Sequence, residues 1–134
     1  MTQATIEASA RPAPGTLTRV TQVALWVNGA MTGLASTLFL AGVVPHANES
    51  PALAHRVAAG HYFGVVLLPF VALRLRKDPS MILLAIAFVF LNWACSLYEL
   101  VATRSPDALP PLTFESIFLT VYTVFALARL RPPR

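Results

Sequence analysis

Three ionisable side chains of this sequence, His61, Glu99 and Glu115, lie within or beside long apolar segments. Such groups are costly in an apolar setting unless they have a partner or a use. A carboxyl group withdrawn from water favours its protonated form, whereas an imidazole exchanges its proton near neutrality. The three residue types therefore predict acid/base chemistry on a lipophilic substrate, with Glu99 as the acid/base, His61 as its proton partner and Glu115 beside them.

Polar side chains in the same segments would orient such a substrate. Asn92 and Tyr98 share a segment with Glu99, Tyr62 follows His61, and Asn28 begins a polar stripe in the first segment. Three stripes have helical spacing, and we expect each to face another helix because lipid offers no hydrogen-bond partner. They are Asn28, Thr32 and Ser36; Asn92, Ser96 and Glu99; and Ser116, Thr120 and Thr123.

Each candidate also has a purely structural interpretation. Glu115 would complement the positive end of a helix dipole, His61 would hydrogen bond to a neighbouring helix, and Glu99 would pair with Arg56 or Arg104. One histidine and two carboxylates are also a possible metal-ligand set. However, the sequence has no HExxH motif, and His55 and His61 are six positions apart. We therefore expect no metal and, without a glycine-rich phosphate loop or CxxC motif, no cofactor.

The elements that must position these residues are four apolar segments. The chain has 134 residues, of which 56% are hydrophobic and 12% charged, whereas soluble domains carry about 25% charged residues. A single cysteine, Cys95, excludes an intramolecular disulfide or a cysteine-based zinc site. Segments of about 17–25 apolar residues cross a bilayer as helices. The sequence thus predicts an all-α integral membrane four-helix bundle with spans at about 20–44, 57–73, 81–102 and 114–130.

Residues 1–18 are expected to form a disordered cytoplasmic tail, and 19–134 a single four-span transmembrane domain. Ser50-Pro51 and Asp78-Pro79 are typical helix starts. Pro45, Pro110 and Pro111 are expected to end or delay helices, and Pro69 to kink the second span.

The distribution of charge predicts the orientation. With four spans, eight of the ten basic residues share one side: Arg11, Arg19, Arg74, Arg76, Lys77, Arg129, Arg131 and Arg134. The positive-inside rule then places both termini in the cytoplasm. The basic excess is explained by topology and by contact with anionic lipid, so nucleic-acid binding is not needed to explain it.

Two GxxxG patterns, Gly29 to Gly33 and Gly60 to Gly64, indicate close helix packing. The run Ala58-Ala59-Gly60-His61-Tyr62-Phe63-Gly64, with an acid late in the third span, resembles the DoxX-like small membrane proteins. The resemblance covers roughly residues 20–130 and implies a four-helix bacterial membrane protein. It carries no functional residue and no redox activity, because no diagnostic motif matches.

Two classes of function remain open at this point. The first is a membrane protein that binds or converts a lipophilic small molecule at a site in the outer leaflet. The second is a non-catalytic accessory or assembly subunit whose glycine faces bind other helices, in a homo-oligomer or with a membrane protein partner. Transport is a third possibility, and it is less favoured because one short bundle would need to oligomerise to form a transport path.

Overall fold

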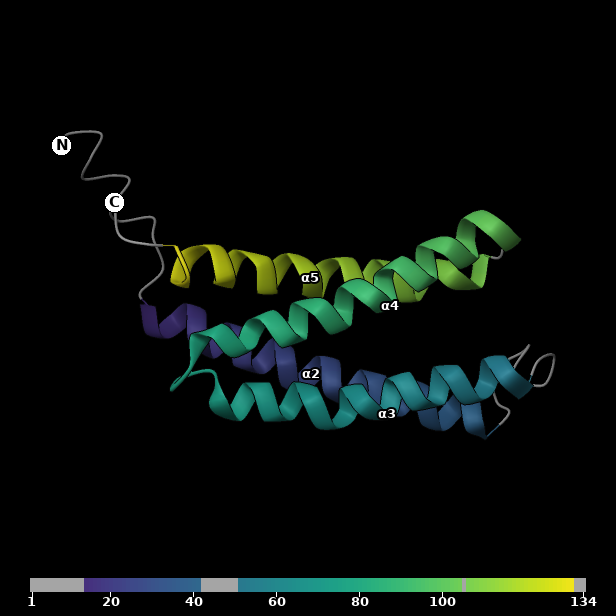
Figure 1. Cartoon of the computed structure of the whole chain (residues 1–134), viewed down its shortest axis with the longest axis horizontal. Helices are drawn as coiled ribbons and strands as arrows, with labels where there is room; N and C mark the ends of the chain where they lie inside the picture. The colour runs from purple at the N-terminus through teal and green to yellow at the C-terminus, as the bar shows by residue number, and fades with distance from the viewer. Residues whose placement is uncertain (1–13, 42–50, 105, 132–134) are drawn as a thin grey trace.

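The computed structural model describes residues 14–41, 51–104 and 106–131, all in helices or the turns that join them (Figure 1). The elements are α2 (Pro14–Leu40), α3 (Pro51–Arg74), η1 (Pro79–Met81), α4 (Ile82–Thr103), η2 (Pro106–Ala108) and α5 (Leu109–Arg129). No strand occurs in these ranges. The prediction of an all-α chain with four long helices is confirmed.

The four helices form two antiparallel pairs. α2 packs chiefly against α3, and α4 chiefly against α5. The start of α2, the turn from α3 to α4 and the end of α5 lie together at the left of Figure 1. We call this the basic end, because it carries Arg19, Arg74, Arg76, Lys77, Arg129 and Arg131. The opposite end of the helices, which carries Arg104, is the far end.

Prolines explain where the helices begin. α3 starts at Pro51, as predicted, and Asp78 caps η1 by accepting a hydrogen bond from the backbone N–H of Ser80 at 3.0 Å. α5 starts at Leu109, five residues before the predicted start, and α2 starts at Pro14, inside the predicted tail. The early positions of a helix have backbone N–H groups with no intrahelical acceptor, so they tolerate proline. The remainder of the tail and Pro45 lie outside the described residues.

The buried core occupies the half of the bundle next to the basic end. Its members come from all four helices and include Leu25, Leu68, Leu75, Ile82 and Tyr122, each 0% exposed. Within the described part of α4, no residue after Val89 is buried. The two pairs are therefore joined by side-chain packing mainly along this half.

Glycines let the helices approach closely. A Cβ atom added at Gly29 would lie 3.3 Å from Cδ of Pro69, and one at Gly33 would lie 3.1 Å from Cγ2 of Val65. The first GxxxG pattern therefore faces α3, as expected for close packing. A Cβ atom at Gly64 would overlap the ring of Phe88 on α4, whereas Gly60 has nothing within 4 Å of that position.

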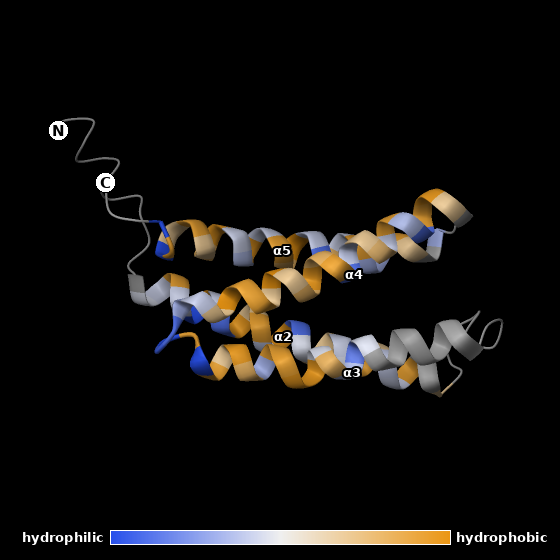
Figure 2. Ribbon diagram, in the orientation of Figure 1, coloured by the Kyte–Doolittle hydropathy of each residue, from blue (hydrophilic) through white to orange (hydrophobic). Residues whose placement is uncertain are grey.

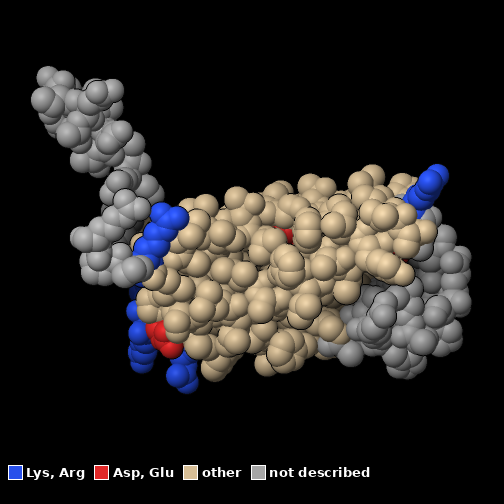
Figure 3. Space-filling view, turned by 45° about the horizontal axis from the view of Figure 1, so that its top comes forward, with Lys and Arg blue, Asp and Glu red and all other residues tan. Residues whose placement is uncertain are grey.

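Large apolar side chains are exposed on all four helices, and Figure 2 shows hydrophobic residues along the described length of each. Val66 is 71% exposed, Leu73 68% and Leu91 65%. Figure 3 shows the basic side chains gathered at the ends of a long body with little charge. Two stretches, Pro79–Ala102 and Leu109–Arg129, are long and apolar enough to cross a membrane, and only 17% and 11% of their windows are buried inside the protein. The apolar part of α3 in the described range, Gly60–Arg74, is shorter.

Candidate functional site

A group of polar side chains lies between α4 and α5, in the half of the bundle away from the basic end. The hydroxyl of Ser96 donates to Oε2 of Glu115 at 3.0 Å. The indole N–H of Trp93 donates to Oγ of Ser116 at 2.9 Å, and that hydroxyl donates to the carbonyl of Leu112 at 2.7 Å. We call Trp93, Ser96, Glu115 and Ser116 the α4–α5 polar cluster.

Helical spacing brings these residues together. Trp93 and Ser96 are three residues apart and so share one face of α4, while Glu115 and Ser116 are neighbours on α5. The early start of α5 changes the interpretation of Glu115, because six residues of helix precede it and no acid lies in the first turn. The interaction of a charge with the helix dipole falls off within the first turn. The described contact of the Glu115 carboxyl group is therefore with Ser96 of α4, and not with the backbone at the start of α5.

Glu99, which the sequence favoured as the acid/base, lies on the exposed surface of α4. Tyr98 beside it is 75% exposed, and Asn92 is half-buried. The carboxyl group that hydrogen bonds across the helix interface is that of Glu115. The structure thus brings Glu115 together with Ser96, a stripe residue to which the sequence analysis gave no site role.

His61 is half-buried on α3, and its Nδ1 atom is buried without a hydrogen-bond partner within the described part of the chain. It precedes Gly64 by three residues and shares its helix face, which contacts Phe88 of α4 and Thr32 of α2. Tyr62, directly after it, is 49% exposed. A buried nitrogen without a partner is a costly feature that a ligand or water can relieve.

His61 and Glu115 lie at different depths along the bundle. The contact of Gly64 with Phe88 gives a common level for α3 and α4. At a rise of about 1.5 Å per residue, His61 lies about 4.5 Å beyond this level, and Ser96 lies about 12 Å beyond it. The two candidate groups are thus offset by about 7.5 Å along the axis, a separation that a small molecule with several carbons spans.

Asn28 belongs to a different set of contacts. Its Nδ2 donates to the hydroxyl of Tyr122 at 3.1 Å, its Oδ1 accepts from Thr32 at 3.3 Å, and the Tyr122 hydroxyl donates to the carbonyl of Ala24 at 3.4 Å. Asn28 is 8% exposed and Tyr122 0%. This network joins α2 to α5 inside the core, so Asn28 has a structural role there.

Tyr122 is the residue that the sequence analysis missed. A signal was present, because a tyrosine in the middle of an apolar segment needs a partner for its hydroxyl. The stripe of Asn28, Thr32 and Ser36 does face inward as predicted, with Ser36 0% exposed. The stripe of Ser116, Thr120 and Thr123 does so only in part, since Thr120 and Thr123 are exposed.

Several other ionisable groups fall outside what the structure describes: residues His46 and Glu49, and the side chains of His55 and Arg56. Within the described ranges, no group of three or more histidine, cysteine, aspartate or glutamate residues has the arrangement of a metal site.

No family model matches the chain, and no curated protein or solved structure matches it significantly. The resemblance to DoxX-like proteins therefore stays a prediction.

Proposed function

We propose that the chain is a four-span integral membrane protein that binds or converts a lipophilic small molecule between its two helix pairs. Both termini are cytoplasmic in this proposal, and the binding site lies in the half of the bilayer away from the basic end. Exposed apolar side chains on all four helices support insertion into lipid, as does the restriction of most basic residues to one end.

The observation that carries the proposed binding site is the pair of unusual polar groups in the far half. Glu115 lies between α4 and α5 and is held by Ser96, and His61 Nδ1 on α3 is buried with no partner among the described residues. An ionisable group inside a membrane span is costly and is by default a candidate for a functional site. One group comes from each helix pair, which supports a ligand site to which both pairs contribute.

The chemistry follows from the residue types. The Glu115 carboxyl group can hydrogen bond to, or exchange a proton with, a hydroxyl or carbonyl group of a lipophilic molecule. The imidazole of His61 supplies a second donor or acceptor about 7.5 Å along the axis. Tyr62, next to His61, would contact the ligand at the entrance, whereas Glu99 and Tyr98 lie on the exposed face of α4, outside the proposed site. Asn92 is half-buried on α4 and would line the route of the ligand from the entrance to Glu115.

The test is to identify the lipophilic molecules that copurify with the full chain in mild detergent, by mass spectrometry of organic extracts. We expect Glu115→Gln and His61→Leu each to lower the retained molecule about tenfold, the effect of one lost hydrogen bond to a charged group. Glu99→Gln is the matched control, because it makes the same substitution on the exposed surface of α4. This variant should retain more of the lipophilic molecule than Glu115→Gln does. Equal retention by Glu115→Gln, His61→Leu and the unaltered chain would contradict the proposed binding site.

Membrane topology has its own test. In a Cys95→Ser background, single cysteines replace Lys77 in the turn between α3 and α4 and Arg104 at the far end. A membrane-impermeant maleimide added to intact cells should label the cysteine at 104 and not the one at 77. Labelling of both or neither position, or the reverse pattern, would contradict the proposed orientation.

A second function, that of a non-catalytic subunit, is favoured by one observation. Gly60 has open space where a side chain would begin, so the second GxxxG pattern leaves part of α3 free for a helix of another chain. Under this alternative, Gly60→Leu would abolish copurification of a membrane partner or of a tagged second copy. Under the binding proposal, the same variant keeps its small molecule.

A further inference from the structure

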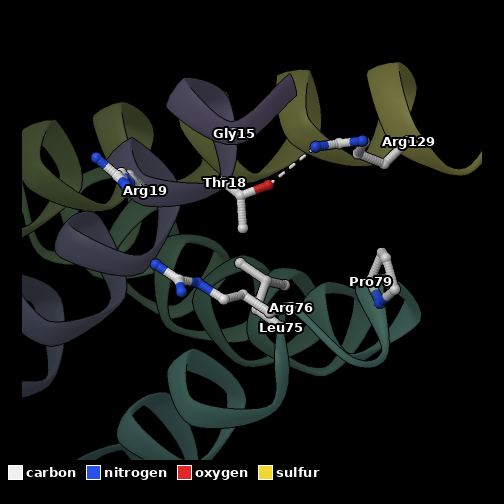
Figure 4. Close-up of a pocket in the computed structure, with 7 residues that line it drawn as sticks. All are labelled: Gly15, Thr18, Arg19, Leu75, Arg76, Pro79 and Arg129. Atoms are coloured by element: carbon white, nitrogen blue, oxygen red, sulfur yellow. Dashed lines mark hydrogen bonds between the residues drawn. The ribbon is translucent and has the colours of Figure 1, made fainter. Parts of the chain in front are cut away.

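A second site lies at the basic end, far from Glu115 and His61. An open pocket of about 310 Å³ is lined by Gly15, Thr18, Arg19, Leu75, Arg76, Pro79 and Arg129 (Figure 4). Its three arginines come from three places in the chain: α2, the turn after α3 and the last turn of α5. Residues distant in sequence thus bring three positive charges to one concave surface.

Two of the arginines are held in place by hydrogen bonds. Nη2 of Arg129 donates to Oγ1 of Thr18 at 3.1 Å, and Nε of Arg76 donates to Oε1 of Gln22 at 3.2 Å. Gln22 is itself fixed, because its Nε2 donates to the carbonyl of Ala72 at 2.8 Å. In Figure 4 the Arg129 side chain reaches toward Thr18 from one side, and Arg19 and Arg76 extend on the other.

The start of α2 at this end also favours an anion. The first turn of α2 begins at the pocket edge, where Gly15 has no atom within 4 Å of its Cβ position. Backbone N–H groups in a first helical turn lack intrahelical acceptors and attract negative charge. The acid at this end of the described chain is Asp78, whose carboxylate accepts hydrogen bonds from the N–H and hydroxyl of Ser80.

We propose that this pocket binds a phosphate group, and specifically the phosphodiester headgroup of an anionic lipid at the membrane surface. Arginine is suited to this role because its planar guanidinium group binds phosphate oxygens in pairs. The floor of the pocket is apolar at Leu75 and Pro79, and the exposed apolar sides of the helices begin directly beside it. A lipid can therefore place its headgroup among the arginines and its acyl chains along the bundle. The inference rests on the membrane insertion proposed above, but not on Glu115 or His61.

The test uses the full chain in detergent, with bound lipid counted by native mass spectrometry. Phosphatidylglycerol should bind and phosphatidylcholine should bind at least about fivefold less, because the choline group cancels the phosphate charge. Arg19→Gln and Arg76→Gln should each lower phosphatidylglycerol binding about fivefold, the effect of one basic residue near an anionic surface. Lys77→Gln is the matched control, because Lys77 lies next to Arg76 in sequence but does not line the pocket.

Each outcome decides the proposal. Equal losses in Lys77→Gln and Arg76→Gln would overturn it, since net charge alone would then explain binding, and so would equal binding of the two lipids. Protection of the pocket arginines from a guanidinium-modifying reagent by inorganic phosphate, without any by phosphatidylglycerol, would overturn the lipid as the source and leave a soluble phosphate compound. Circular dichroism of each variant verifies the helical fold. Retention of lipophilic molecules by Arg76→Gln at the wild-type level would separate this site from the one at Glu115.

Discussion

The two halves of this bundle differ in how they are held together. Next to the basic end, side chains from all four helices interdigitate in a buried core, and Asn28 and Tyr122 add a hydrogen bond between α2 and α5. Toward the far end, Tyr98 and Val101 on α4 are 75% and 70% exposed, and two side-chain hydrogen bonds join α4 to α5. The half next to the basic end is therefore the better packed of the two.

The strongest test of this contrast uses two phenylalanines of α5. Phe125 is 1% exposed in the core, and Phe114 is 46% exposed in the far half. We expect Phe125→Ala to lower the free energy of unfolding by about 3 kcal/mol through the cavity that it leaves. Phe114→Ala should change it by less than about 0.5 kcal/mol. Denaturant unfolding in detergent micelles measures both, and similar losses would remove the distinction between the halves.

Two glycines of α3 test where close packing between the helices ends. Gly64→Ala places a methyl group against the Phe88 ring, so overpacking should cost about 1–3 kcal/mol. Gly60→Ala introduces the same methyl group into open space and should be neutral or stabilising, because alanine favours the helix by about 1 kcal/mol. The melting temperatures of the two variants should move in opposite directions; a shared direction would count against the close contact.

A pair of tyrosines tests the hydrogen bond in the core. Tyr122→Phe removes the acceptor of Asn28 Nδ2 and leaves that amide buried, at a cost of about 1 kcal/mol. Tyr62→Phe removes a hydroxyl from a side chain that is 49% exposed, and should leave stability unchanged. Thermal unfolding of both proteins provides the comparison, and an unaffected Tyr122→Phe would mean that the network adds nothing to stability.

The smallest expected effect lies in the turn at the basic end. Asp78→Ala removes the cap of η1 and should cost about 0.5 kcal/mol. Asp78→Asn keeps an acceptor at the same place and serves as the control. Hydrogen exchange at the N–H of Ser80, read by mass spectrometry, should speed up in the alanine variant alone.

The helices were largely predictable from the sequence, because the length of an apolar run and the position of a proline depend only on neighbouring residues. Asp78-Pro79 and Ser50-Pro51 began helical segments where expected. The start of α5 at Leu109 was missed because Pro110 and Pro111 were expected to delay the helix, although proline fits the early positions of a helix. The start of α2 at Pro14 was missed because residues 1–18 were expected to form a disordered tail. Which helices pair, by contrast, depends on the shapes of distant side chains, such as Phe88 against Gly64, and sequence periodicity does not encode it.

The sequence predicted which residues belong to the candidate site better than it predicted how they are arranged. The sequence selected Glu115 and His61 from the cost of ionisable groups in apolar segments, and both are withdrawn from the surface. It preferred Glu99, but the rotation of α4 turns Glu99 outward and Ser96 toward Glu115. The rotation of a helix is set by its packing partner, so a stripe of polar residues did not identify which of its members would face α5.

The contact between Gly64 and Phe88 also has a mechanical consequence. Beyond Val89, which is next to this contact, α4 continues to Thr103 over about 21 Å, and no described residue after Val89 in this helix is buried. A tilt of about 5° about the contact would move the end of α4 by about 2 Å, given that rise. A small change in how Phe88 packs against Gly64 would therefore displace the far end of α4 by about 2 Å.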